Sequence, residues 1–281
     1  MSQDLVIEAV GVRKRYGGVV ALDGVDFRAR RGLTALVGPN GAGKTTLIEG
    51  LLGLRKLDEG RVWVLGEEVR GELPPGLARK IGVVLERMSL LDTLTAVENL
   101  QLVAELSGIR IARRDIFHAL ELVGAGDLAK RLYGDLSTGQ RRKVDIAATL
   151  LGNPELVILD EPEAGLDPAA RVELIELLGK LAKGGLAVLF STHDLALAAK
   201  AWEISVIIRG KVAASGRPEE VAQRYGGRWR VHYRLRHGEE RVVELSDVGE
   251  LPAALRDLHN VVSVEVKPPD LFEAFRKLAH D

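Results

Sequence analysis

The 281-residue sequence contains no cysteine, only two methionines and no excess of either charge. Without cysteine, the chain cannot form disulfides, iron–sulfur clusters or thiolate zinc sites. Its 39 Lys and Arg residues almost cancel 40 Asp and Glu residues, so the chain as a whole does not attract nucleic acid or anionic lipid. We therefore expect no nucleic-acid partner.

Long apolar runs are also missing. No stretch approaches the roughly 18 consecutive apolar residues of a membrane-spanning helix, and the first residues, MSQDLVIEAVGVRKRYGG, lack the apolar stretch of a signal peptide. Hydrophobic residues make up 46% of the chain and charged residues 28%, which is a globular composition. We expect a soluble protein of about two domains that acts at a membrane only through a partner.

Short apolar runs alternate with amphipathic segments over residues 1–220. The expected strands are 5–10, 19–29, 33–37, 156–160 and 186–190. Continuous apolar runs that enclose an amphipathic helix at 168–183 predict buried parallel strands in an α/β sheet. Apolar residues spaced three and four apart predict a helical subdomain, at about residues 89–152, inserted between the strands.

The last part of the chain reads as a small α+β domain. Glycine, proline and charged residues cluster at 217–227, which predicts a boundary that separates residues 1–220 from 221–281. Residues 228–236 alternate strictly between apolar and basic side chains, which is typical of a half-buried antiparallel strand. The other expected elements are strands at 241–245 and 261–266 and helices at 247–258 and 271–279. Ten basic residues balance ten acidic ones after residue 220, which favours a solvated face over a nucleic-acid site.

A glycine-rich segment follows the expected strand 33–37 and precedes a helix, as the P-loop pattern requires. Its backbone N–H groups would turn inward around phosphates, and the start of the helix adds its positive dipole end. Lys44 would reach the β- and γ-phosphates, and Thr45 would ligate Mg²⁺. The alternative is a glycine-rich turn without a ligand, which the flanking strand and helix disfavour. The expected phosphate-binding residues are Gly38, Pro39, Asn40, Gly41, Ala42, Gly43, Lys44, Thr45 and Thr46.

The apolar run at 156–160 ends in two carboxylates, Asp160 and Glu161. Ligands of α/β proteins bind at the carboxyl ends of parallel strands. Asp160 fits a residue that holds Mg²⁺ through its water shell, and Glu161 fits a base that polarises the attacking water. Taken alone, the pair is equally consistent with an ordinary surface end of a strand.

The segment Leu136-Ser137-Thr138-Gly139-Gln140 stands at the start of an expected helix. With it, the sequence resembles the nucleotide-binding subunit of an ABC transporter, whose signature is LSGGQ; Thr138 replaces the first glycine. The resemblance implies a P-loop ATPase core of the ABC type with an inserted helical subdomain. It also implies a head-to-tail pair with two ATP molecules between the chains, each gripped at its γ-phosphate by Ser137, Gly139 and Gln140 of the other chain. Independently, a helix N-terminus with a hydroxyl favours anions, and Ser137 also fits a simple N-cap.

Three more residues match this family. Tyr16 matches the aromatic residue on which adenine stacks, although a strand aromatic in the core is the alternative. Asp167, in the segment Ala164-Gly165-Leu166-Asp167, resembles a residue that crosses to the partner. His193 resembles the switch histidine that contacts the γ-phosphate. The resemblance therefore implies that Lys44, Glu161 and His193 carry the catalysis.

The sequence departs from the family at two positions. Glu86 stands where a glutamine normally coordinates Mg²⁺ and the attacking water. A carboxylate is a good ligand for a hard ion, so we expect metal binding to persist, with hydrolysis slowed or re-tuned by the added charge. The implied metal ligands are Thr45, Glu86 and Asp160. Glu163 replaces the usual threonine, and the sequence offers no physical account of that change.

The run 137–143, the small α+β extension and the ending 268–279 are similar to the ATPase subunits of ABC-2-type exporters, a class that includes drug- and antibiotic-efflux systems. This implies an ATP-hydrolysing subunit that pairs with itself or a similar chain. It would energise a separate transmembrane permease from the cytoplasmic face of the cell membrane. A soluble cassette ATPase usually carries a coiled-coil insertion or a second cassette, and the sequence has neither. A regulatory module that senses ATP with negligible turnover is the other alternative.

Overall fold

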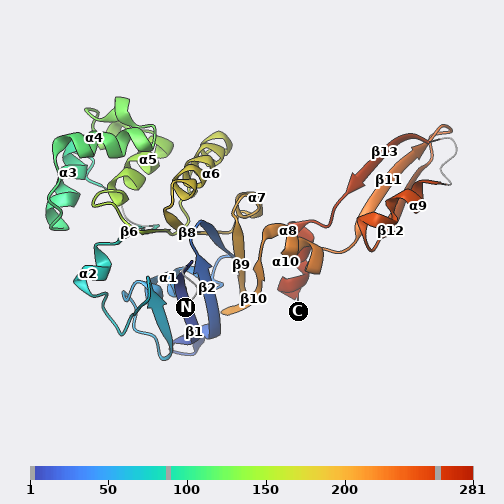
Figure 1. Cartoon of the computed structure of the whole chain (residues 1–281), viewed down its shortest axis with the longest axis horizontal. Helices are drawn as coiled ribbons and strands as arrows, with labels where there is room; N and C mark the ends of the chain where they lie inside the picture. Colours follow the sequence, from blue (N-terminus) through green and yellow to red (C-terminus); the bar gives the residue numbers. More distant parts are fainter. Residues whose placement is uncertain (1–3, 87–89, 257–260, 281) are drawn as a thin grey trace. The chain divides into compact units, whose positions relative to one another are not determined.

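The computed structural model describes residues 4–86, 90–256 and 261–280, and these form two units, Met1–Ala214 and Ser215–Asp281 (Figure 1). The expected boundary near residue 220 lies a few residues too late, because it falls inside helix α8 (Pro218–Tyr225) of the second unit. Helix α8 packs on α10 (Leu271–His280) of the same unit. Among the described residues, no helix is both long enough and apolar enough to cross a bilayer.

The first unit is built on a six-stranded sheet in the order β10-β9-β3-β8-β7-β6. Its strands are β3 (Leu33–Val37), β6 (Ile81–Val84), β7 (Leu156–Leu159), β8 (Ala187–Thr192), β9 (Glu203–Ile208) and β10 (Lys211–Gly216). The pairs β3–β8, β3–β9, β7–β8 and β6–β7 are parallel, as the continuous apolar runs predicted. Strands β3, β6, β7 and β8 therefore end at one edge, and the loops that follow them lie close together.

A second, four-stranded sheet has the order β2-β1-β4-β5. Its strands are β1 (Leu5–Tyr16), β2 (Val19–Arg30), β4 (Glu59–Val64) and β5 (Glu67–Glu68). The expected strand 5–10 was too short, because β1 continues through shifts in register near Gly11 and pairs with β2 as far as Tyr16 opposite Val19. Helix α1 (Lys44–Leu51) contributes Leu47, Ile48 and Leu51 to one core that includes residues of both sheets.

Three helices, α3 (Ala96–Leu106), α4 (Arg113–Leu122) and α5 (Thr138–Thr149), pack on one another at one end of the first unit (Figure 1). They form the expected helical subdomain, whose expected first residue, 89, lies outside the described residues. The side chain of Asn99 is buried. Its Oδ1 accepts a hydrogen bond from the Leu91 N–H, and its Nδ2 donates to three carbonyls of residues 91–95, so it fixes the loop before α3. Two single-turn 3-10 helices, Gly126–Leu128 and Tyr133–Asp135, lead to α5.

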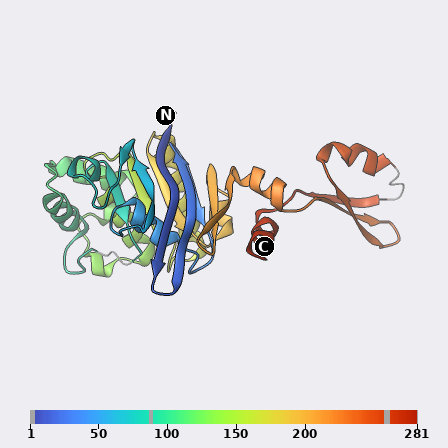
Figure 2. The same cartoon turned by 90° about the horizontal axis from the view of Figure 1, so that it is seen from below.

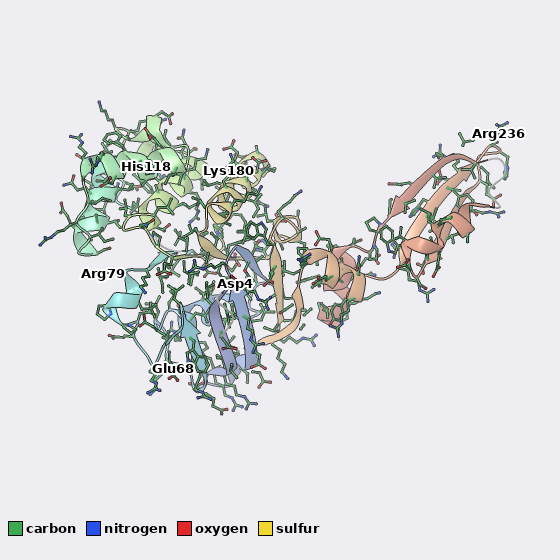
Figure 3. The ribbon with its side chains drawn as sticks, in the orientation of Figure 1. Asp4, Glu68, Arg79, His118, Lys180 and Arg236 are labelled. Atoms are coloured by element: carbon green, nitrogen blue, oxygen red, sulfur yellow. The ribbon has the colours of Figure 1, made fainter. Side chains whose placement is uncertain are left out.

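Helix α6 (Pro168–Lys183) has the bounds that the sequence predicted, because its end signals are local. Asp167 is the N-cap and accepts the Ala170 N–H at 2.9 Å, proline occupies the first turn, and the basic residues Lys180 (Figure 3) and Lys183 occupy the last turn. The remaining helices of this unit are the single turns α2 (Pro75–Ala78) and α7 (Leu195–Ala198).

The second unit contains a three-stranded antiparallel sheet in the order β12-β11-β13. Its elements, besides α8 and α10, are β11 (Trp229–Leu235), β12 (Glu240–Leu245), a 3-10 turn (Val248–Glu250), α9 (Leu251–Arg256) and β13 (Val261–Lys267). Val231, Tyr233 and Leu245 are buried, and Leu251 of α9 packs against them. Figure 2 shows the short helix over one face of the sheet. The strict alternation at 228–236 thus predicted β11 correctly. The expected helix at 247–258 is split between the turn and α9, and residues 257–258 lie outside the described part.

A polar network connects the helical subdomain internally. The Tyr133 hydroxyl donates to Asp145 Oδ1 at 2.7 Å, and Arg142 Nη1 lies 3.8 Å from Asp145 Oδ2. Burial raises the pKa of the Asp145 carboxyl from 3.8 to about 6, and the hydrogen bond from Tyr133 and the charge of Arg142 offset only part of this shift. The folded chain therefore holds a proton on Asp145 that the unfolded chain has already released at pH 5.

This shift predicts the effect of Asp145→Asn on stability. As the pH rises from about 4 to about 6, the unfolded parent ionises first, so the parent loses up to about 3 kcal/mol of unfolding free energy relative to the variant. Urea unfolding of both proteins at pH 4, 5, 6 and 7 measures this difference. Parallel stability curves for parent and variant would show that the Asp145 pKa is not raised.

Candidate nucleotide-binding site

The loop between β3 and α1, residues 38–43, begins at the carboxyl edge of the six-stranded sheet. The Gly38 N–H donates to Thr192 O of β8 at 3.2 Å. A β-carbon at Gly38 would lie 2.2 Å from Ile207 O of β9, so only glycine fits between these strands. This contact turns the chain abruptly from the sheet into the loop.

The N-terminus of α1 faces the same loop. Its N-cap is Gly43, with a left-handed φ of 105°, no side chain caps the helix, and the first turn contains no acidic residue. The N–H groups of this first turn therefore keep their capacity to bind an anion. At Gly41, where φ is 78°, a β-carbon would meet no atom within 4 Å, so the loop is open on that side. Both features fit a phosphate cradle.

Lys44, the first residue of α1, points back into the loop and is only 4% exposed. Its Nζ donates to Gly38 O at 2.9 Å and to Pro39 O at 3.1 Å. The same nitrogen lies 3.1 Å from Oε1 of Glu161. The ammonium charge is thus enclosed by two carbonyl dipoles and one carboxylate, which compensate for its burial.

Glu161 follows β7 and has a φ of 45°, a left-handed conformation that is uncommon for a residue with a β-carbon. Such a conformation costs about 1–3 kcal/mol and persists where the surroundings impose it. Here the Glu161 N–H donates to Ser191 Oγ at 2.9 Å, while the carboxylate lies between Lys44 and His193, whose Nδ1 is 3.5 Å from Oε2. The His193 side chain is 49% exposed. Three loops therefore bring together Lys44, Glu161 and His193.

Asp160 is 1% exposed and accepts the Ser191 hydroxyl proton on Oδ1 at 2.5 Å. Its Oδ2 is buried without a hydrogen-bond partner among the described residues. A buried carboxylate oxygen without a protein partner fits a ligand such as the water shell of a hard cation. Within the described part of the chain, no three His, Asp or Glu residues form a metal site by themselves. A cation here would need oxygens from elsewhere, as Mg²⁺ takes from phosphates.

The other two expected metal ligands follow β3 and β6, whose parallel strands end at the same edge of the sheet as β7. Thr45 is exposed in the first turn of α1. Glu86 is exposed, two residues beyond β6, whose Val84 O accepts the Asp160 N–H at 2.8 Å. Tyr16, at the end of β1, is 40% exposed. Lys14 Nζ lies 5.5 Å and the Arg55 guanidinium carbon 5.7 Å from its ring centre.

The residues of the LSTGQ segment lie at a second place, the N-terminus of α5. The Gln140 N–H donates to Ser137 Oγ at 3.3 Å, and the Ser137 N–H donates to Gln140 Oε1 at 3.1 Å, which forms a capping box. Beside it is a groove of about 480 Å³, lined by this helix end, Gly139 included, by residues 165–167 and by α6. None of the residues 38–46 lines this groove. One chain therefore carries two separate helix N-termini, one at the loop 38–43 and one at this groove.

The sequence analysis assigned no role to the hydroxyls of Ser191 and Thr192, and it did not explain why a glutamate stands at position 163. Ser191 bridges Asp160 and the Glu161 backbone, and Thr192 hydrogen-bonds the carboxyl of Glu163. Glu163 is 1% exposed, and burial raises the pKa of its carboxyl. The available signal was a Ser-Thr pair at the end of a buried strand directly before His193.

Comparison with known proteins agrees with this geometry. Residues 22–164, about half of the chain, match the family described as ABC transporter. The chain belongs to the ABC transporter family. It is 39% identical over 228 residues to the daunorubicin resistance ATP-binding protein DrrA3 of Streptomyces coeruleorubidus, covering 80% of this chain and 72% of that protein. It is 33% identical over 226 residues to the linearmycin resistance ATP-binding protein LnrL of Bacillus subtilis, covering 79% and 72%.

Solved structures give the same assignment. An ATP-binding cassette of an ABC transporter in its ADP conformation superposes with a TM-score of 0.70 at 29% identity, covering 77% of this chain and 92% of that chain. A cassette in a dimeric post-hydrolysis state with ADP and phosphate gives a TM-score of 0.66 at 27% identity, covering 75% and 98%. The expected P-loop ATPase fold of the ABC type is confirmed. The chain is an ATP-hydrolysing, nucleotide-binding subunit of the ABC exporter kind.

The loop geometry predicts the effect of Gly41→Ala. The variant should fold, with a loss of about 1–2 kcal/mol for the left-handed backbone. Its affinity for ATP should fall about tenfold or more, because the new β-carbon occupies the open side of the loop. Urea unfolding and titration with a fluorescent ATP analogue measure the two effects.

Gly179→Ala is the matched control, because Gly179 lies inside α6 with open space around it and an ordinary φ. This variant should gain about 0.5–1 kcal/mol and bind ATP as the parent does. If Gly41→Ala bound ATP with parental affinity, residues 38–46 would not be the phosphate site.

Proposed function

We propose that ATP is bound between two copies of this chain, or between it and a similar chain, and that hydrolysis lets the pair separate. The phosphates of each ATP would lie in residues 38–46 of one chain and against the α5 end of the other. The observation that carries the proposal is the convergence of Lys44, Glu161 and His193 beside an uncapped helix end. A separate α5 end suits a second chain, and a related cassette, 28% identical with a TM-score of 0.67, was solved as a dimer.

The capping box of α5 leaves hydrogen-bond donors available to a phosphate. Ser137 Oγ and Gln140 Oε1 are used as acceptors, so the Ser137 hydroxyl proton and the Gln140 amide N–H groups remain. The Gly139 N–H, in the first turn, adds a third donor. Charge-assisted hydrogen bonds contribute about 1.5–3 kcal/mol each. Shifting an equilibrium from 1:99 to 99:1 takes about 5.5 kcal/mol, so two such sites suffice to close a pair.

Glu161 is the proposed base for the attacking water, and Lys44 and His193 are the proposed contacts of the γ-phosphate. Phosphate oxygens would compete with Glu161 for Lys44 Nζ, now 3.1 Å from the carboxylate. That competition frees the carboxylate to accept a proton from water. Lys44 then stabilises the charge that develops on the phosphoryl oxygens. The exposed ring of Tyr16 is the proposed stacking surface for adenine.

We propose Thr45, Glu86 and Asp160 as the residues that hold Mg²⁺. Asp160 has a buried oxygen without a partner among the described residues, and Thr45 and Glu86 follow strands that end at the same edge of the sheet. The ion would neutralise negative charge on the phosphates. Ser191 keeps Asp160 in place through the bond to Oδ1, and the buried Oδ2 keeps its capacity to accept a hydrogen bond from the ion's water shell.

The helical subdomain is the proposed link to a transmembrane permease on the inner face of the cell membrane. It carries an apolar groove of about 480 Å³ between α3, α5 and β6, lined by residues such as Val103, Ile109 and Ala148. The relatives named above are ATP-binding proteins of resistance systems, which supports export as the work that hydrolysis drives. In this architecture the cargo contacts the permease.

The base assignment is tested by Glu161→Gln. This variant should bind ATP, accumulate as an ATP-bound pair and hydrolyse ATP about 10²- to 10⁴-fold more slowly, because the amide cannot accept the proton. Size-exclusion chromatography with ATP and a phosphate-release assay measure both effects. Glu67→Gln, at an exposed position of β5, is the control and should behave as the parent. Hydrolysis by Glu161→Gln at the parental rate would exclude Glu161 as the base.

Glu86→Gln tests the metal set. The change removes one negative charge near the γ-phosphate and keeps an oxygen ligand, so Mg²⁺-dependent hydrolysis should be preserved or raised. Phosphate release is measured across a range of Mg²⁺ concentrations. If hydrolysis by the variant no longer depended on Mg²⁺ at all, Glu86 would be the sole metal ligand. That result would contradict the proposal that Thr45, Glu86 and Asp160 hold the ion together.

A further inference from the structure

The loop that joins β7 to α6 is bonded to the turn that carries His193 through a buried carboxyl group. Glu163 Oε1 and the Thr192 hydroxyl form this bond, and both residues are almost completely buried. Thr192 Oγ1 also accepts the Asp194 N–H at 2.9 Å. Because that N–H already uses the hydroxyl as an acceptor, the single Thr192 proton is directed to Glu163. Glu163 therefore sets the orientation of the residue just before His193.

A second connection lies on the other side of His193. Arg171, in the first turn of α6, places Nη1 3.3 Å from Asp194 Oδ2 and donates from Nε to Leu166 O at 3.1 Å. Asp194 in turn caps α7 by accepting the Ala196 and Leu197 N–H groups. His193 thus lies between two residues that are each bonded to the segment around residues 163–171.

The first connection has an energetic cost that packing alone does not explain. Burial of a carboxyl group is unfavourable, and Glu163 Oε2 has no hydrogen-bond partner among the described residues. Burial also raises the pKa of this carboxyl. An apolar residue of similar size would fill the same space without that cost. A long side chain with an acceptor at its end is needed, however, to reach the hydroxyl of Thr192.

We propose that Glu163 is a positioning residue for His193: it connects the loop 163–167, of which residues 165–167 line the groove beside Ser137, to the turn of His193. A shift of this loop then changes the distance between His193 Nδ1 and Glu161 Oε2, which is 3.5 Å in the structure. When a second chain occupies the groove, the resulting shift of the loop therefore changes the position of His193 at the phosphate site of the same chain. The inference rests on the proposed role of His193 and adds that a second chain in the groove regulates hydrolysis at that site.

Turnover kinetics of Glu163 variants test the inference. Glu163→Leu keeps the volume and removes the acceptor, so kcat should fall about 10- to 100-fold while KM for ATP stays within about twofold. Glu163→Gln keeps the acceptor and should stay within about threefold of the parental kcat. Thr192→Val removes the bond to Glu163 and also the bond from the Asp194 N–H, so its kcat should fall at least as far as that of Glu163→Leu. The double variant should be no slower than Thr192→Val, because that substitution already breaks the contact with Glu163. Glu176→Leu, at an exposed position of α6, is the control.

Three results would overturn the inference: losses that multiply in the double variant, a Gln variant as slow as the Leu variant, or a change in KM instead of kcat. ATP titration and urea unfolding of each variant separate positioning from a loss of the fold. If Glu163→Leu does not fold, Thr192→Val and Glu163→Gln still decide the question. These outcomes do not depend on Glu161→Gln, so failure of the base assignment and failure of this inference are distinguishable.

Discussion

The arrangement of this site depends on one buried cation. Lys44 sits inside the loop that begins α1, and its ammonium group is held by two loop carbonyls and by Glu161. An enclosed charge requires fixed partners, so Lys44 connects the loop after β3 to Glu161, which follows β7. Glu161 in turn takes a left-handed backbone, and its carboxylate also faces His193. The strain at Glu161 and the position of His193 are thus both connected to Lys44.

Strand β8 organises the rest of the site because it lies between β3 and β7. Its last two residues carry hydroxyls, and successive side chains of a strand point to opposite faces. Ser191 holds Asp160 and the Glu161 backbone, while Thr192 holds Glu163. One strand end therefore bonds both Asp160, the proposed metal ligand, and Glu163, in the segment that leads to α6.

The N-termini of α1 and α5, proposed above to bind the phosphates of ATP, give a physical reason for pairing. The α1 end and the α5 end lie in different parts of the first unit, and the groove at the α5 end has no residue of 38–46 in its lining. If two copies face each other so that each α1 end meets the α5 end of the other, both sites form at once. Such an arrangement is closed and limits itself to two chains.

The sequence by itself determined the elements whose signals are local. The P-loop residues, the parallel strands and the bounds of α6 follow from glycine spacing, continuous apolar runs and helix caps, and the structure contains them where the pattern predicted. Only the tertiary structure decided the extent of β1, which depends on pairing with β2, and the place of α8, which depends on packing against α10. It also decided the use of Glu163 and Ser191, because their partners lie about thirty residues away along the chain. Short-range rules specify turns and faces, whereas a hydrogen bond between two loops exists only after the sheet has placed their strands side by side.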